Sequence, residues 1–451
     1  MGFHREDLLR LTLRQAATAP RANKSRHEIP EYHLTPSVRD DDTGEIVWPA
    51  PKEQIECARN FILECVAAKK KTLIVPDKDA DGLTSGAILQ KTLVLLGLDP
   101  DLISAHLLEK GRNIHDDDER VAMAAYEPAY VFVLDQGSQR SPPVIDATHK
   151  ALVIDHHWAL DDEFPAGSEH VSACHSPPVA TSSLLTYHIC AALHDMVPST
   201  CDWLCAMGTH GDLGTRLKWE PPFPDMKATF KTYTKTAINK AVSLINAPRR
   251  TAAYDVPGAW AALTTAHSPT ELLENPSLLA ARAEVNAEVK RCSHIAPKFS
   301  SDERIAVIRI DSTAQVHSII ATRWAGYLQS PKLEAILVAN EGNLPGLINF
   351  SCRVPQSART REPPVNLIEV LKGVADRAPS PSLRERLGES FARGHTVASG
   401  GIVPKAEFEE LIDILEVRRK PAWGNTTKTE SSAPPQQSNT PMDYFGKQET
   451  G

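Results

Sequence analysis

Residues 72–82 read Thr-Leu-Ile-Val-Pro-Asp-Lys-Asp-Ala-Asp-Gly, an apolar run followed at once by three alternating carboxylates. A short apolar run bounded by turn residues is typical of a buried strand. The sequence therefore predicts a strand at 72–76, with Asp77, Asp79 and Asp81 in the turn between this strand and the next helix. In open α/β sheets, ligands bind at the carboxyl ends of the strands.

Three further segments of the first half repeat this pattern of an apolar run that ends in an acidic residue. They are 130–134 before Asp135, 151–154 before Asp155-His156-His157 and, with a weaker pattern, the segment leading to Asp212. Helical patterns separate these runs, at 55–66, 86–98 and 179–193. Strands that alternate with helices predict a doubly wound α/β domain with a parallel sheet at residues 45–225.

The remainder of the chain divides into a connector, a second domain and two terminal segments. Residues 226–296 have a helical composition, and we expect a helical connector whose basic stripe is formed by Lys227, Lys231, Lys235 and Lys240. Candidate strands at 304–310, 335–339 and 347–352 and a helix at 405–417 predict a smaller α/β domain at 297–420. Residues 1–44 form an N-terminal extension, and the polar tail 421–451 is expected to be disordered because it lacks aliphatic residues.

The composition excludes several classes of protein. With 41% hydrophobic and 24% charged residues, the chain has no apolar run long enough for a membrane span. The net charge of −8 argues against coating of nucleic acid through bulk positive charge. The eight cysteines are scattered, which predicts a reducing, intracellular location in cytoplasm or nucleus. The arginines within residues 1–27 are compatible with a mitochondrial transit peptide, which is the alternative location.

The acidic strand ends have two interpretations. One aspartate after Pro76 could simply cap the next helix. A cap needs a single carboxylate, however, and three within five residues repel one another unless a cation neutralises them. Imidazole and carboxylate ligands together suit Mn²⁺, Fe²⁺ or Zn²⁺, and a site made mainly of carboxylates favours Mn²⁺ or Mg²⁺. Three coinciding acidic strand ends thus favour a metal site.

Four segments, in this order, resemble the motifs of the DHH phosphoesterase superfamily, and in particular its RecJ-like single-strand exonucleases. They are Asp77-Lys-Asp-Ala-Asp-Gly82, the lone Asp135, Asp155-His156-His157 and Gly208-Thr-His-Gly-Asp212. The second domain resembles the associated DHHA1 module through Ser351-Cys-Arg353 and Gly394-His395-Thr-Val-Ala-Ser-Gly400. Arg393 stands where the module's signature begins with a glycine.

The resemblance implies two divalent cations, with Mn²⁺ favoured and Mg²⁺ as the alternative. Asp135 would bridge both ions, Asp77 and Asp81 would hold one, and Asp79, His156 and Asp212 would hold the other. Leu73 replaces a histidine found in related enzymes, and Asp81 would supply the missing ligand.

The resemblance also implies the groups that meet the substrate. His157 would face its phosphate, and Asp155 would support a histidine of the site. The groups of the second domain that would bind the substrate are Arg353, Gly394, His395 and Gly400.

Three functions follow as hypotheses. The first is a RecJ-like exonuclease that acts on single-stranded nucleic acid or oligonucleotides, along which the basic stripe of the connector would lie. The second is a phosphatase or phosphodiesterase acting on nanoRNA, cyclic dinucleotides, nucleotide bisphosphates or polyphosphate. The third is a non-catalytic scaffold in a replication complex. A weak sliding-clamp peptide is a further hypothesis for Pro441-Met-Asp-Tyr-Phe445 in the tail.

Overall fold

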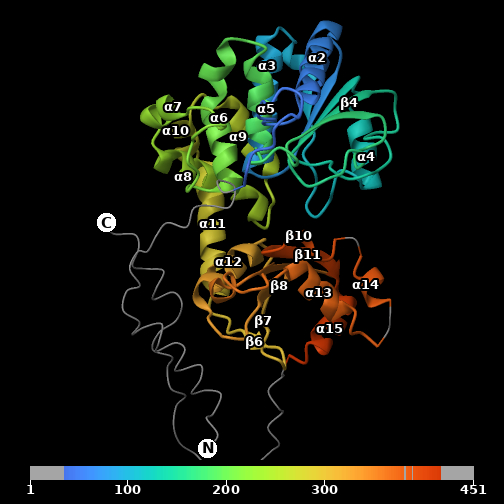
Figure 1. The fold of residues 1–451 in the computed structure, drawn as a ribbon, viewed down its shortest axis with the longest axis vertical. Helices are drawn as coiled ribbons and strands as arrows, with labels where there is room; N and C mark the ends of the chain where they lie inside the picture. Colours follow the sequence, from blue (N-terminus) through green and yellow to red (C-terminus); the bar gives the residue numbers. More distant parts are fainter. Residues whose placement is uncertain (1–34, 380–381, 389, 418–451) are drawn as a thin grey trace, which may run out of the picture. The chain divides into compact units, whose positions relative to one another are not determined.

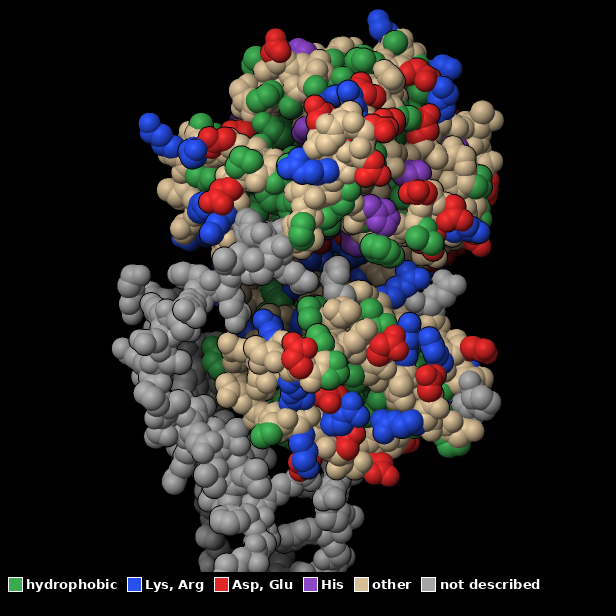
Figure 2. Space-filling model, viewed as in Figure 1, with side chains coloured by type: hydrophobic (Ala, Val, Ile, Leu, Met, Phe, Trp, Pro, Cys, Tyr) green, Lys and Arg blue, Asp and Glu red, His purple; other side chains and the backbone are tan. Residues whose placement is uncertain are grey.

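The computed structural model describes residues 35–379, 382–388 and 390–417, which form two compact units (Figure 1). Of these residues, the first unit comprises 35–249 and Ala253–Arg282, and the second comprises Arg250–Ala252 and those from Ala283 to 417. Acidic and basic side chains are interspersed over the visible face of each unit (Figure 2). None of the helices within the described ranges is long and apolar enough to cross a membrane. The tail motif at 441–445 lies outside these ranges.

A five-stranded parallel sheet forms the centre of the first unit. Its strand order is β2-β1-β3-β4-β5, with β1 at Thr72–Pro76, β2 at Ile103–Ala105, β3 at Tyr130–Leu134, β4 at Lys150–Asp155 and β5 at Ser168–Ser172. In β1 and β3 every residue is buried, as is usual for parallel strands that are covered on both faces.

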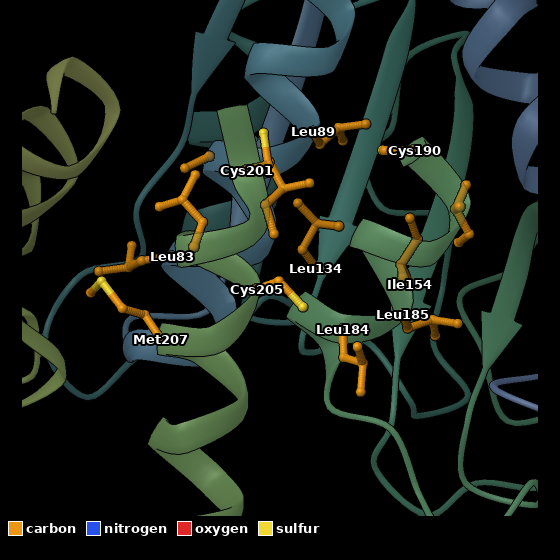
Figure 3. Close-up of a cluster of buried hydrophobic side chains, with 14 of the residues drawn as sticks. Leu83, Leu89, Leu134, Ile154, Leu184, Leu185, Cys190, Cys201, Cys205 and Met207 are labelled. Atoms are coloured by element: carbon orange, nitrogen blue, oxygen red, sulfur yellow. The ribbon is translucent and has the colours of Figure 1, made fainter. Parts of the chain in front are cut away.

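Alternate residues of these strands serve the two faces of the sheet. Phe132, Leu134 and Ile154 contribute to a large core cluster with the helices α2 (Lys52–Ala68), α3 (Ala80–Leu95), α5 (Ser182–Ala191) and α6 (Met196–Leu213). Figure 3 shows Leu134 and Ile154 facing side chains of α3, α5 and α6. Leu73 and Val133 belong to a second cluster on the opposite face, to which α4 (Asp117–Ala124) contributes Met123. This alternation is the two-residue period of a strand.

The helices that follow α6 extend the first unit. They are α7 (Lys227–Thr232), α8 (Lys235–Ile245), the turn η3 (Pro248–Arg250), α9 (Val256–Thr265) and α10 (Pro269–Leu273). Ile238, Leu244 and Leu263 of these helices are buried in the same core cluster as α3 and α6. The boundary between the two units falls within α11 (Pro276–Cys292). The helices of the predicted connector therefore belong mostly to the first unit, and the four lysines of its stripe are divided between α7 and α8.

The second unit contains a six-stranded mixed sheet with the order β10-β11-β9-β8-β7-β6. Its strands are β6 (Lys298–Phe299), β7 (Ile305–Ile310), β8 (Ala335–Leu344), β9 (Leu347–Arg353), β10 (Arg393–His395) and β11 (Ala398–Pro404). One face packs Phe350 and Leu337 against α13 (Leu367–Ala375), α14 (Leu383–Arg386) and α15 (Lys405–Ile414). Helix α12 (His317–Tyr327) packs against β8 and β9.

The expected α/β class and parallel sheet are confirmed, and one predicted strand is wrong. The segment that leads to Asp212 is not a strand but the last part of α6, which begins at Met196. Its buried run from Trp203 to Met207 has the apolar character of a buried strand. The length of the segment would have indicated a helix, because an apolar pattern that extends over 18 residues is too long for an ordinary strand.

Candidate metal centre

The loop after β1 places three carboxylates around the start of α3. Asp79 is the N-cap of α3, and its Oδ1 accepts hydrogen bonds from the backbone amides of Asp81 (3.0 Å) and Gly82 (3.4 Å). Gly82 is needed here, because a Cβ would come within 2.6 Å of the carbonyl oxygen of Asp77. The capping interpretation therefore holds for Asp79, while Asp77 and Asp81 have other partners.

Asp81 is fully buried, and both of its carboxylate oxygens accept hydrogen bonds from the start of α5. The backbone amide of Ser182 donates to Oδ2 at 2.7 Å, and that of Ser183 donates to Oδ1 at 3.0 Å. These amides are among those that a helix leaves unsatisfied at its N-terminus. The helix thus fixes the position of Asp81 and favours its charged form.

Asp135 directly follows strand β3, and Asp155 is the last residue of the neighbouring strand β4. Asp135 has a left-handed backbone with φ +61°, and its buried carboxylate accepts a hydrogen bond from Ser182 Oγ at 2.9 Å. Asp155 is fully buried and accepts hydrogen bonds from Ser138 and from the backbone amides of His156 and His157. Asp155 thus holds the turn that presents both histidines.

His156 points a nitrogen into a group of carboxylates. Its Nε2 lies 3.2 Å from Asp135 Oδ1, 3.2 Å from Asp212 Oδ2 and 3.9 Å from Asp81 Oδ2. This nitrogen is buried, yet it is not aligned for a hydrogen bond with any partner. A buried nitrogen that lies close to carboxylates without hydrogen-bond alignment calls for an explanation, and a bound ion is one that suits this ring of donors.

His157 differs from its neighbour in exposure and in partner. Its Nδ1 lies 2.8 Å from Asp155 Oδ1, while 55% of the side chain is exposed. Burial acts to lower the pKa of His157, but the contact with Asp155 outweighs it and raises this pKa to about 9. Asp155 pairs with His157 and not with the ring of His156.

The pKa shifts show how much negative charge is crowded here. Burial, and after it the charge of Asp212, raises the pKa of Asp81 to about 6. Burial and the charge of Asp81 raise the pKa of Asp135 well above its usual value. Burial would lower the pKa of His156, but the nearby carboxylates outweigh it and raise this pKa well above 6.5. Each ionised carboxylate makes it harder for its neighbour to ionise. A bound cation would stabilise the ionised form of all of them.

The cluster fits metal ions in its donor types and spacing. Three overlapping groups have ligand atoms within 4.8 Å of one another. They are Asp77, Asp79 and Asp135; Asp81, His156 and Asp212; and Asp135, His156 and His157. Oxygen donors with few nitrogens suit Mn²⁺ or Mg²⁺. Asp135 belongs to two of these groups, which is the arrangement that a bridging ligand requires.

Several residues of the site were not found by sequence reasoning. Ser182 and Ser183 hold Asp81 and Asp135, and Lys78 Nζ lies 3.1 Å from Asp77 Oδ1. Burial would raise the pKa of Asp77, but the charges of Lys78 and Arg249 outweigh it and lower this pKa. The run Thr181-Ser-Ser before an apolar stretch is a helix-start signal that could have pointed to Ser182.

Arg249, which follows the lysines of the basic stripe in the sequence, lies among the carboxylates. Its guanidinium lies 3.6 Å from Asp79 Oδ2 and donates to Asn246 Oδ1 at 3.0 Å. The side chain of Asn246 in turn accepts a hydrogen bond from the backbone amide of Ala80. Arg249 thus belongs to the carboxylate cluster. The four lysines are exposed; Lys227 pairs with Asp225, and Lys235 lies over the ring of Phe230.

The residues expected to bind substrate in the second unit lie on adjacent strands. Arg353 ends β9, where it donates to Ser351 Oγ and to the carbonyl of Cys352, both at 2.9 Å. Gly394 in β10 and Gly400 in β11 both make close backbone approaches, because a Cβ would meet the carbonyl oxygen of Ala398 at 2.6 Å and that of Phe350 at 2.5 Å. The backbone of His395 pairs with Ala398, and its side chain is not among those described.

Comparisons with known proteins agree with this architecture. Residues 71–209 match the DHH family, N-terminal domain. The fold is similar to that of RecJ in complex with Mn²⁺ from Thermus thermophilus, with a TM-score of 0.58 and 19% identity over 83% of this chain and 55% of that chain. The chain thus spans about half the length of the Thermus protein.

Two further solved structures share the fold. Exonuclease RecJ bound to manganese has a TM-score of 0.55 and 19% identity, over 82% of this chain and 94% of that one. The DHH domain of a protein described as a member of a ribosomal protein family has a TM-score of 0.56 and 15% identity, over 92% of this chain and 98% of that one. No curated protein matches the chain.

Proposed function

Because the chain carries a DHH-family domain at residues 71–209 within a RecJ-like fold, we propose that it is a metal-dependent phosphoesterase that hydrolyses phosphodiester bonds. The substrate we propose is single-stranded nucleic acid or short oligonucleotides, attacked from an end. Mn²⁺ is the cation we favour, since the RecJ structures named above contain Mn²⁺.

One observation carries this proposal: the buried Nε2 of His156 lies 3.2 Å from the carboxylates of Asp135 and Asp212 and 3.9 Å from that of Asp81, without being aligned for a hydrogen bond to any of them. Carboxylates crowded around one buried imidazole repel one another unless a cation neutralises them. A purely structural role for the cluster would be expected to satisfy this nitrogen and to separate the carboxylates. A ligand set for cations explains both features.

Each residue of the cluster then has a chemical role. We assign the first ion to Asp77, Asp79 and Asp135 and the second to Asp81, His156, Asp212 and the same Asp135, which exchanges Asp79 and Asp81 relative to the assignment that the resemblance implied. Bound cations would supply Lewis acidity at a phosphate oxygen and neutralise the carboxylates. His157, exposed and held by Asp155, is placed to donate a hydrogen bond to a phosphate oxygen. Arg353, with the backbone amides near Gly394 and Gly400, would bind phosphate in the second unit.

The decisive experiment is a metal-dependence series on end-blocked substrates. Labelled DNA and RNA 30-mers, each with a 5′ block, a 3′ block or no block, would be incubated with Mn²⁺, Mg²⁺, Zn²⁺ or EDTA. We expect Mn²⁺-dependent release of mononucleotides that is prevented by one of the two blocks. Hydrolysis of none of these strands under any metal condition would refute the nuclease proposal.

Asp135→Asn is the variant that tests the proposed metal centre. Asparagine tolerates the left-handed backbone at this position, so the fold should be kept while the bridging charge is lost. We expect activity to fall by at least about 100-fold. Asp101→Asn, which alters an exposed carboxylate of the same unit, is the matched control.

The second candidate is an enzyme for short substrates, since the candidate metal centre would act on a short phosphoester as well as on a long strand. Comparing turnover of a 3-mer with that of a 30-mer separates the two. A strong preference for the 3-mer, or turnover of a cyclic dinucleotide or polyphosphate with no action on the 30-mer, would favour this candidate.

A further inference from the structure

Trp158 presents a large aromatic surface at the residue that follows the two histidines of the candidate metal centre. It directly follows His157, and 72% of it is exposed. An aromatic side chain carries about 150–250 Å² of surface that gains from being covered. Isolated exposed apolar residues are nevertheless common, so exposure alone assigns no role.

The backbone on both sides of Trp158 is fixed. On one side, the backbone amide and the ring of His157 both bond to Asp155. On the other side, Ala159 is 2% exposed within the core cluster of the sheet, and its carbonyl oxygen lies 2.8 Å from His175 Nε2. The exposed ring is therefore carried by an anchored stretch of backbone.

The ring of Trp158 is also restrained from the side. It makes a T-shaped contact with the ring of His175, with centroids 4.7 Å apart and an interplanar angle of 75°. His175 is itself held at the carbonyl of Ala159. Because one contact orients the ring while most of it stays exposed, little conformational entropy is left to lose when a flat ligand covers it.

We propose that Trp158 is a stacking platform for a nucleobase of the substrate, next to the phosphate that His157 would meet. This inference rests on the proposed function, which places a phosphate at His157. Neighbouring Cα atoms are about 3.8 Å apart, so the backbone positions that carry the two side chains lie within the length of one nucleotide. Stacking is tolerant of sequence because every base has a π-face, so Trp158 would select nucleotides over base-free phosphoesters without selecting among bases.

Equilibrium binding to the full-length protein tests the inference without requiring turnover. The probes are a phosphorothioate oligonucleotide of five residues and the same oligomer without bases, each titrated in the presence of Mn²⁺. For Trp158→Ala we expect binding of the base-bearing oligomer to weaken about 5- to 150-fold and binding of the abasic oligomer to be unchanged. Trp158→Phe should keep most of the affinity, whereas Trp158→Leu, which lacks a π-face, should not. Val121→Ala, at another exposed apolar residue of the same unit, is the control.

The outcomes separate this inference from the proposed function. The role of Trp158 would be overturned if Trp158→Ala lost affinity equally for both oligomers or for neither. It would also be overturned if the wild-type protein bound the two oligomers equally well. Loss confined to the base-bearing oligomer would support it, even if the metal-loaded protein hydrolysed no substrate. Hydrolysis that depends on Asp135 and not on Trp158 would leave the phosphoesterase proposal standing alone.

Discussion

Asp81 shows how single residues set the charge of this site. Burial raises its pKa, while two backbone amides of α5 bond to its two oxygens. Ser182 links it to the next carboxylate, because the amide of Ser182 bonds to Asp81 and its hydroxyl bonds to Asp135. Groups that orient metal ligands in this way commonly contribute as much as some ligands do.

Ser182→Ala is expected to weaken Mn²⁺ binding about 10- to 100-fold, because the carboxylate of Asp135 loses a hydrogen bond that orients it. The amide that bonds to Asp81 is unchanged, so the fold should be kept. Isothermal titration with Mn²⁺ measures the effect, and Ser243→Ala, at an exposed serine of α8, is the control. Unchanged Mn²⁺ affinity would show that Ser182 does not orient Asp135.

His317 makes a pH prediction for the second unit. It is buried at the start of α12 with an unpaired Nδ1; burial, and after it the charges of Arg250 and Arg353, lowers its pKa to about 3. An unfolded histidine binds its proton near pH 6.5, so this group stabilises the fold fully above that pH. The contribution is lost as the pH falls from about 6.5 towards 3.

We therefore expect His317→Asn to reduce the loss of stability between pH 7.5 and pH 5. The wild-type loss from this group is about 2 kcal/mol at pH 5. Denaturant unfolding of the full chain at both values measures it, with His267→Asn as the control at an exposed histidine. An identical pH dependence in wild type and His317→Asn would contradict the prediction.

At the scale of elements, the close packing of α3, α5 and α6 depends on one glycine. A Cβ at Gly208 of α6 would come within 2.2 Å of Ser183 Oγ and 2.3 Å of Thr84 Oγ1. Ser183 belongs to α5 and Thr84 to α3. Gly208 thus allows the helices that carry Asp81 and Asp212 to approach each other.

Gly208→Ala is expected to destabilise the first unit by about 1–3 kcal/mol, because a well-packed core does not accommodate an added methyl group. Thermal unfolding followed by circular dichroism measures the change. Gly373→Ala in α13 is the control, since nothing lies within 4 Å of the added Cβ and alanine favours a helix. A stability equal to that of the wild type would show that the helices separate without cost.

Sequence reasoning succeeded where a pattern is local. The strands at Thr72–Pro76 and Tyr130–Leu134 have the predicted bounds, because continuous apolar runs that end at an aspartate leave few alternatives. Strand β2 was missed because its residues Ile103–Ala105 are few and only partly buried. Ser182 and Arg249 were not recognised as neighbours of the carboxylates, because their contacts join residues far apart in the sequence. The roles of the site residues and the domain boundaries remain predictions.

At the scale of the whole molecule, the two units differ in what they contain. All of the carboxylate and histidine groups that could hold a metal ion, within the described residues, lie in the first unit. A ligand that binds only the folded form stabilises the unit that binds it.

Mn²⁺ should therefore raise the unfolding temperature of the first unit and leave that of the second unchanged. At 100 times the dissociation constant, the stabilisation is about 2.7 kcal/mol. Calorimetry of the full chain with Mn²⁺ and with EDTA measures both transitions, and Asp135→Asn should remove most of the shift. A shift confined to the second transition would place the ion elsewhere.

The capping bonds of Asp79 have a consequence for how this protein can change over evolutionary time. Its Oδ1 accepts the hydrogen bonds that cap the N-terminus of α3, while its Oδ2 faces Arg249 and the carboxylate cluster. A descendant that lost catalysis could replace Asp212 freely, but at position 79 it would still need a side chain that caps a helix, such as Asn, Ser or Thr. Drift at this position should therefore stop at capping residues, which would leave a trace of the lost site in a protein that no longer uses it.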